Sequence, residues 1–327
     1  MKKRYLLIWT LLLSFAANLS AQSYGVVNFS VNFMREAPDY TAELGDQALM
    51  GTVVEILDQQ GYWLKIKSPE PYTAWVNDMG IVRMDEKELA GYIRAPKYIC
   101  IADHTYMYSR PDSGSERVTD LVMGDLLRIQ FNDKGNRPVH RKGWSAALLP
   151  SGIKGYVRTE ELQEFKKWAE SRVPSADNII RTARTMLGVP YFWGGTSTKG
   201  VDCSGLVRTS CFMNGLLLPR NASQQAKIGD AVEIGEIGNR TIENLERGDL
   251  LFFGNIQKGK VTHVGIYLGD GLFIHSSLLV RINHLIPTET DKYNGIARLL
   301  YARRIINQQD KGKGIISITE SPYYFAD

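Results

Sequence analysis

Apolar and polar residues alternate in short runs over the first half of the chain, from about residue 24. The runs that alternate, or that are rich in β-branched and aromatic residues, are residues 26–33, 52–57, 62–66 and 72–76. Such runs are typical of β-strands, and the Gly and Pro residues between them mark turns. Similar features return in the same order at residues 110–111, 125–129, 143–144 and 155–157. A repeated unit of five strands predicts two small β-barrels, at residues 22–90 and 91–161.

The pattern changes to helical spacing in the second half. Residues 162–177 are charged and broken by Pro174, which predicts a helical linker. Asp177 is then a candidate cap for a helix whose apolar stripe ends at Gly188. Later β-rich runs begin at residues 250, 261, 272 and 296. Helices against an antiparallel sheet predict an α+β domain at residues 178–306, and the tail at 307–327 either adds an edge strand or frays.

The N-terminus has the pattern of an export signal. Residues 1–4 are basic, residues 5–17 are mostly apolar, and Ser20-Ala21 offers a cleavage site with small side chains. This predicts a signal peptide over residues 1–21, too short for a membrane anchor, and hence a periplasmic or secreted protein.

The amino-acid composition and net charge bear on which kinds of binding partner to expect. The 327 residues include 44% hydrophobic and 23% charged residues, which is ordinary for globular proteins. Loss of Lys2, Lys3 and Arg4 with the signal leaves 36 basic residues against 35 acidic ones, a net charge of +1. The basic pI therefore gives no argument for nucleic acid or for an anionic membrane as partner. We expect a monomer of two or three domains.

The three cysteines argue against a disulfide framework and against zinc. An odd number leaves at least one thiol free, and Cys203 and Cys211 lie two turns apart on one predicted helix. No Cys-x-x-Cys or His-Glu-x-x-His pattern occurs, so we expect no metal.

Cys203 is the strongest candidate for a nucleophile in this sequence. It follows Asp202, a candidate N-cap, at the point where a Gly-rich segment becomes a helical pattern. The first turn of a helix favours an anion, so the helix start is expected to lower the thiol pKa from about 8.5 toward neutrality. Cys211, in an apolar context, fits a buried structural residue instead.

A thiolate needs a base, and the sequence after Cys203 predicts one in a β-hairpin. Residues 261–268 and 272–277 are β-rich and joined by Gly-Asp-Gly. If Leu268 faces Leu272, then Gly265 faces His275, and His263 lies on the same face as His275 as its diagonal neighbour. A nucleophile, a base and a group that orients the base make a triad.

Four motifs then carry a resemblance to a known family. They are Pro-Tyr-x-Trp-Gly-Gly at 190–195, Asp-Cys-Ser-Gly at 202–205, Gly-Asp-Leu-Leu-Phe-Phe at 248–253 and His-Val-Gly-Ile-Tyr-Leu-Gly at 263–269. Residues 178–304 resemble the NlpC-type cell-wall cysteine peptidases, papain-like enzymes that cleave peptides of peptidoglycan. Both predicted barrels resemble the bacterial SH3-like domains that commonly flank such enzymes. The resemblance implies an α+β papain-like domain after two SH3-like barrels.

The same resemblance implies roles for individual residues. Cys203 would be the nucleophile, His263 the general base and His275 the polar third member, without a cofactor. Tyr191 and the Cys203 backbone N–H would stabilise the oxyanion.

The domain order resembles that of γ-D-glutamyl-L-diamino acid endopeptidases, which act on stem peptides with a free N-terminal L-Ala. The substrate-binding residues that this resemblance implies are Asp202, Ser204, Trp193, Glu36, Tyr72 and Asn221. For Glu36 and Tyr72 the alternative is a surface carboxylate and a strand aromatic.

One position departs from the family pattern. The expected Pro-Arg-Asp-x-x-Gln is Pro-Arg-Asn-Ala-Ser-Gln at residues 219–224. Asn221 offers the substrate ammonium a neutral carbonyl where the family pattern has a carboxylate, and Glu36 could supply the missing charge.

Three alternatives remain open. The chain could be a wall-binding protein with an inert peptidase fold, although the complete set of Cys203, His263 and His275 argues against this. It could be an acyltransferase relative, but those carry His before Cys. It could also be a γ-D-glutamyl endopeptidase that is indifferent to the free amine.

Overall fold

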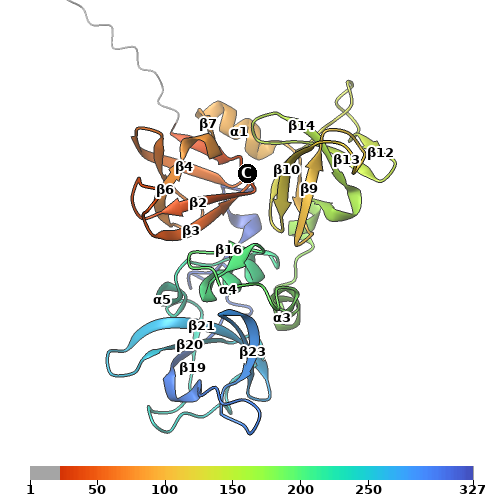
Figure 1. Ribbon diagram of the computed structural model, residues 1–327. Helices are drawn as coiled ribbons and strands as arrows, with labels where there is room; N and C mark the ends of the chain where they lie inside the picture. The colour runs from red at the N-terminus through yellow and green to blue at the C-terminus, as the bar shows by residue number, and fades with distance from the viewer. Residues whose placement is uncertain (1–22, 327) are drawn as a thin grey trace, which may run out of the picture.

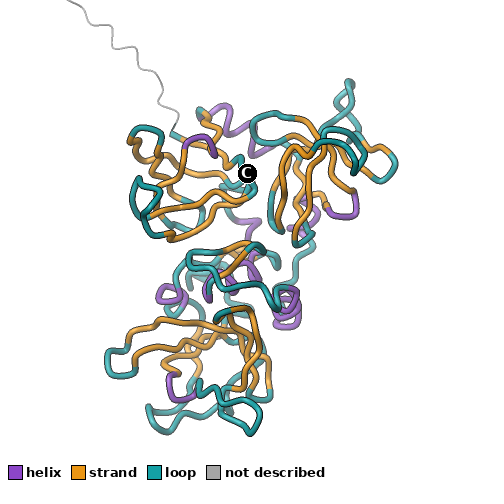
Figure 2. Tube along the Cα trace, viewed as in Figure 1, coloured by secondary structure: helices purple, strands orange, loops and turns teal. Residues whose placement is uncertain are grey.

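The computed structural model describes residues 23–326, and the predicted signal peptide lies outside this range. Two β-sheet units lie side by side, and a third unit with a sheet of its own lies below them (Figure 1). Helices α3, α4 and α5 lie between the lower sheet and the two upper ones (Figure 2).

The first unit is a seven-stranded antiparallel sheet in the order β3-β2-β6-β5-β4-β1-β7. Its apolar face encloses Val27, Met34, Val54, Leu64 and Val76. The strands are β1 (Tyr24–Val27), β2 (Val31–Arg35), β3 (Leu44–Leu49), β4 (Val53–Gln60), β5 (Trp63–Lys67), β6 (Thr73–Asn77) and β7 (Ile81–Met84).

The second unit repeats this topology. Its order is β10-β9-β14-β13-β11-β8-β15, which matches the first sheet strand for strand, and β12 is an additional strand beside β13. The strands are β8 (Lys97–Cys100), β9 (His104–Tyr108), β10 (Arg117–Val122), β11 (Leu126–Ile129), β12 (His140–Arg141), β13 (Trp144–Leu148), β14 (Lys154–Arg158) and β15 (Leu162–Glu164). The internal repeat is therefore confirmed, but each unit has seven common strands instead of five, because short strands carry too few residues to show alternation.

Two helices connect the units differently from the prediction. Helix α1 (Glu86–Arg94) joins the two sheets and begins with a capping box of Asp85 and Glu88. The predicted linker starts as strand β15 of the second sheet and continues as α2 (Phe165–Glu170), whose Phe165 and Trp168 are buried.

Helix α3 (Ala176–Thr185) is capped by Ser175 and not by Asp177. The Ser175 hydroxyl accepts a hydrogen bond from the Asn178 N–H at 3.2 Å, because Ser175 is the last residue with extended backbone. Asp177 lies in the first turn and pairs with Arg247 at 2.7 Å.

The third unit packs α4 (Cys203–Phe212) against an antiparallel sheet in the order β19-β24-β20-β21-β22-β23. These strands are β19 (Asp230–Val232), β20 (Leu250–Asn255), β21 (Lys260–Gly269), β22 (Leu272–Ser277), β23 (Leu279–His284) and β24 (Leu299–Arg304). The shorter elements are β16 (Thr196–Ser197), β17 (Gly200–Val201), β18 (Leu216–Leu217) and α5 (Ala222–Gln225). The strand predicted from residue 296 begins at Leu299, after a 3-10 turn at Ile296–Arg298.

The C-terminal tail packs against the protein and adds a strand. Strand β25 (Ile316–Ser317) pairs with β18, and Tyr324 is buried in the core that α2 and α4 share. The Tyr323 hydroxyl donates a hydrogen bond to Glu55 of the first unit. Within residues 23–326, no helix is both long enough and apolar enough to span a membrane.

A buried ion network joins the first unit to the third. Asp46 on β3 is fully buried and pairs with Arg208 of α4 and with Arg220, both at 2.7 Å. Arg208 also pairs with Glu70 at 2.8 Å, and Arg220 pairs with Asp202 at 2.5 Å. Buried charges are tolerated only when they are paired, so this network fixes the orientation of the two units.

Substitution of Asp46 by Asn should therefore destabilise the protein strongly. The change leaves two buried guanidinium groups without their shared anion, and we expect the free energy of unfolding to fall by about 3–5 kcal/mol. Urea denaturation measures this. The matched control is Glu170→Gln, which breaks an exposed pair with Lys166 and should change it by less than about 0.5 kcal/mol. Equal effects of the two substitutions would contradict a structural role for the network.

Candidate active site

Cys203 occupies the first turn of α4, as predicted. Asp202 is the N-cap, and its Oδ1 accepts a hydrogen bond from the Gly205 N–H at 2.7 Å. A side chain at position 205 would overlap the carbonyl oxygen of Gly195, so only glycine lets the helix start lie this close to the preceding loop. The thiol is 7% exposed and accepts hydrogen bonds from the backbone N–H groups of Val264 and Ser204.

The predicted hairpin forms with the predicted register in its interior. Ile266 pairs with Ile274 and Tyr267 with Phe273, but a bulge at Leu268 pairs Leu272 with Gly269. The turn residues Asp270 and Gly271 both have positive φ, as a two-residue type I′ turn requires. The prediction that Leu268 faces Leu272 is therefore wrong, but only beside the turn. There Leu268 forms the bulge, and Gly269 pairs with Leu272 in its place.

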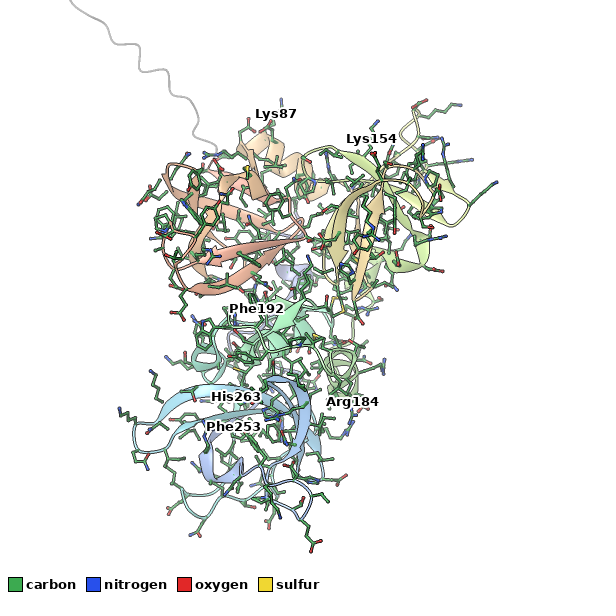
Figure 3. All side chains as sticks on the ribbon, in the orientation of Figure 1. Lys87, Lys154, Arg184, Phe192, Phe253 and His263 are labelled. Carbon is green, nitrogen blue, oxygen red and sulfur yellow. The ribbon has the colours of Figure 1, made fainter. Side chains whose placement is uncertain are left out.

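The hairpin brings the two histidines into contact. His263 Nε2 and His275 Nδ1 are 2.7 Å apart. His275 is fully buried, and its Nε2 lies 2.9 Å from Asn283 Oδ1 on β23. His263 lies on the side of the lower sheet that is turned toward the helices (Figure 3). In the sequence, the only sign of Asn283 is its place on the strand that follows His275.

The electrostatics of the site differ from the expectation for Cys203. Burial, and then the charge of Asp202, raise the pKa of the Cys203 thiol to about 11, although hydrogen bonds and Arg220 oppose the shift. The expected lowering by the helix start is thus wrong for this closed site, because the thiol is almost inaccessible to water. Burial, and then His275, lower the pKa of His263 to about 3. At neutral pH both groups are therefore uncharged, and the imidazole is free to accept a proton.

Most of the predicted site residues line one cleft of about 540 Å³, and they come from three parts of the chain. They are Glu36 and Tyr72 of the first unit, Tyr191, Trp193, Asp202, Cys203 and Ser204 at the start of α4, and Asn221 at the start of α5. His263 follows Thr262, which lines the cleft, and His275 lies buried behind His263.

Tyr191 lies beside the nucleophile candidate. Its backbone N–H donates to the carbonyl oxygen of Leu278 at 2.8 Å, which anchors the residue to the turn between β22 and β23. Burial, and then the neighbouring Cys203 and Asp202, raise the pKa of the Tyr191 hydroxyl, so that it stays a hydrogen-bond donor at neutral pH.

Asp202 and Ser204 are held by Arg220, which sequence analysis did not single out. The guanidinium donates to Asp202 Oδ2 at 2.5 Å and to Ser204 Oγ at 2.9 Å, and only 1% of its side chain is exposed. Asp202 Oδ2 also accepts from the Gly194 N–H at 3.1 Å. The two predicted substrate-binding side chains therefore enter the cleft wall already oriented.

Glu36 and Tyr72 line the cleft from the first unit. The Tyr72 hydroxyl donates to Glu36 Oε1 at 2.5 Å, and a side chain at Gly45 would overlap both groups. Among residues 23–326 no cation pairs with Glu36, so its charge faces the cleft without a counterion. Asn221 is exposed at the N-terminus of α5, where its backbone N–H donates to Gln224 Oε1 at 3.0 Å.

Known proteins resemble the chain over most of its length. Residues 188–295 match the NlpC/P60 family, and residues 30–80 match the bacterial SH3 domain. A gamma-D-glutamyl-L-lysine dipeptidyl-peptidase of Bacillus cereus is 30% identical over 79% of this chain and 76% of its own length. The chain belongs to the NlpC/P60 family.

Further NlpC/P60 relatives agree with the fold. Dipeptidyl-peptidase 6 of Lysinibacillus sphaericus is 30% identical over 77% of this chain and 87% of its own length. The crystal structure of an NlpC/P60 family protein from Bacillus cereus is similar over 87% of this chain and all of its own, with a TM-score of 0.72 and 25% identity. The predicted papain-like fold with an N-terminal SH3 domain is confirmed, and the protein is a cysteine peptidase.

Replacement of Cys203 by Ala should abolish hydrolysis and leave the fold intact, because it removes the nucleophile candidate in the cleft. Cys211→Ala is the control: Cys211 is equally buried, but it lies in the core and does not line the cleft. We expect this variant to keep most of its activity, measured by peptide hydrolysis and thermal unfolding. If Cys211→Ala is folded but inactive and Cys203→Ala is active, the nucleophile is Cys211 and not Cys203.

His275 should make the protein less stable in acid. Burial lowers its pKa from 6.5 to about 4, so between these values the unfolded chain binds a proton that the folded chain does not. The free energy of unfolding therefore falls as the pH falls, by up to about 1.4 kcal/mol per pH unit. Urea denaturation between about pH 7 and pH 5 should give a shallower slope for His275→Gln and an unchanged slope for the exposed His140→Gln. Parallel slopes for all three proteins would contradict a buried neutral His275.

Proposed function

We propose that the protein hydrolyses the bond between γ-D-Glu and the diamino acid of peptidoglycan stem peptides, acting on peptides with a free N-terminal L-Ala. Relatives similar over most of the chain are named gamma-D-glutamyl-L-lysine dipeptidyl-peptidase. The observation that carries the proposal is the cleft, which joins Glu36 and Tyr72 of the SH3 domain to Cys203. A cleft that a second domain helps to line favours short peptides over polymer.

The site supports hydrolysis through a thioester. His263 takes the proton of Cys203 as the sulfur attacks the γ-carbonyl carbon, and the same imidazolium then gives that proton to the leaving amine of the diamino acid. Water, deprotonated by His263, attacks the thioester and releases the thiol. The Cys203 N–H at the helix start and the Tyr191 hydroxyl are suited to bind the oxyanion. Because thiol and imidazole are both neutral at rest, the ion pair forms only with substrate in place.

The cleft contains two carboxylates that pair with no cation among residues 23–326, Glu36 and Glu43, and the Tyr72 hydroxyl holds Glu36 in place. An ammonium group that leaves water for a closed site needs a nearby anion, and without one its burial costs several kcal/mol. Asn221 is neutral, and the carboxylate of Asp202 is already paired with Arg220. Because Tyr72 holds Glu36 in place, we assign the ammonium to Glu36, with Tyr72 and Asn221 as neutral partners.

From the signal-like residues 1–21 we infer that this activity lies in the periplasm or outside the cell. Fractionation of cells that express the full chain tests this part of the proposal, since cytoplasmic retention with residues 1–21 uncleaved would contradict it.

Glu36→Gln should lower kcat/KM on L-Ala-γ-D-Glu-diamino acid peptides about 10- to 100-fold, because a charge-assisted hydrogen bond is replaced by a neutral one. Asn221→Ala and Glu43→Gln, which alter two other residues of the cleft, should each cost less. N-acetylation of the peptide should reduce cleavage by the native protein and reduce it far less in Glu36→Gln. Equal cleavage of free and acetylated peptides by the native protein would instead indicate an endopeptidase that does not recognise the amine.

A further inference from the structure

The hydrogen-bonded chain of the site continues beyond its third member. Asn283 Nδ2 lies 3.1 and 3.0 Å from the two carboxylate oxygens of Asp291, and Asn283 Oδ1 faces His275. The cysteine peptidase chemistry described above assigns nothing to either residue. Both lie within a short stretch after β22, and both are only half-buried.

Asp291 fixes the orientation of the Asn283 amide. An ionised carboxylate only accepts hydrogen bonds, so it must face the NH₂ group of the amide and leave the carbonyl oxygen for His275. Burial raises the pKa of Asp291, but hydrogen bonds from Asn283 and from the backbone N–H groups of Tyr293 and His284 outweigh it and hold the pKa below its ordinary value. Asp291 is therefore a carboxylate at neutral pH.

The amide orientation in turn fixes both imidazole rings. Because Asn283 presents an acceptor, His275 Nε2 must carry the proton, and in the neutral ring Nδ1 is then an acceptor. His263 Nε2, 2.7 Å away, must donate to that atom. His263 Nδ1 is left as the unprotonated nitrogen, and burial keeps the pKa of His275 at about 4, which excludes a second proton on that ring.

We propose that Asn283 and Asp291 are positioning residues that set the tautomer of His263, so that Nδ1 is the atom that takes the proton of Cys203. When that proton moves from Cys203 Sγ to His263 Nδ1, the imidazolium keeps its Nε2–H bond to His275 Nδ1. Neither Asn283 nor Asp291 gains or loses a proton. With the opposite tautomer, Nδ1 of His263 carries a hydrogen and cannot accept one.

The surroundings hold this chain in one arrangement. The rings of Phe273 and Tyr293 lie 4.6 and 5.3 Å from the His275 ring, measured between centroids, and exclude water from it. Asp291 is anchored by the backbone N–H of His284, the last residue of β23, at 2.6 Å. Arg281 lies opposite His275 on β23 and disfavours a charge on that ring, without a hydrogen bond to it.

Exchange of the Asn283 and Asp291 side chains distinguishes control of the His263 tautomer from a purely structural role. Asp291→Asn leaves the Asn283 amide free to turn, and we expect kcat to fall about tenfold at unchanged KM. Asn283→Leu removes the acceptor for His275 and should cost about 10- to 100-fold in kcat. In the double variant Asn283→Asp/Asp291→Asn, position 283 again presents only acceptors to His275. That variant should recover most of the kcat lost in Asp291→Asn.

Two measurements test the proposal without the peptide substrate. In ¹⁵N-histidine NMR spectra, His263 Nδ1 should be the unprotonated nitrogen in the native protein and in the double variant, and partly protonated in Asn283→Leu. Iodoacetamide should alkylate Cys203 at similar rates in the native protein and the double variant, and more slowly in Asn283→Leu. Asp270→Asn, the same chemical change at an exposed turn, is the control and should match the native protein.

Two results would overturn the proposal. One is a double variant no more active than Asp291→Asn alone, with both folded by thermal unfolding. The other is an unchanged His263 tautomer in Asn283→Leu. Because alkylation and NMR do not depend on the peptide, they remain decisive even if the substrate proposed above is wrong.

Discussion

The structure depends on the pairing of buried charges around Arg220. This guanidinium is almost without contact to water, so it must be matched by carboxylates, and it finds one in each of two domains: Asp46 in the SH3 domain and Asp202 beside Cys203. The SH3 domain is thus part of the wall of the catalytic site and not a separate module on a tether. The orientation of Asp202 and Ser204, and the contribution of the SH3 domain to the cleft wall, both follow from this one constraint.

The burial of Cys203 and His263 also sets their protonation at neutral pH. A raised thiol pKa and a lowered imidazole pKa leave Cys203 and His263 both neutral, and both shifts disfavour proton transfer between them in the resting protein. Charge then develops only when a substrate carbonyl is present to receive the sulfur. Such a resting state limits oxidation and adventitious alkylation of Cys203, since the thiolate is the reactive form.

Local features of this protein could be predicted from its sequence, and distant pairings could not. The helix start at Cys203, the register of the histidine hairpin and the repeated β-units follow from spacing, turn residues and period, which act over a few residues. The contact of Asp46 with Arg208 joins residues 162 positions apart, and no local pattern encodes it. Asn283 was missed because a strand asparagine has no signature until its partner is known. The predicted shift of the Cys203 pKa was wrong in direction, because the burial that raises this pKa depends on the whole fold.

The docked C-terminal tail has a consequence for how the protein is made. Tyr323 bonds to Glu55, a residue synthesised 268 positions earlier, and Tyr324 completes a core shared by α2 and α4. The elements that this segment contacts precede it in the sequence, and it covers part of their apolar surface. The three domains can therefore close around this segment only after it has been synthesised, and contacts so distant in sequence form slowly.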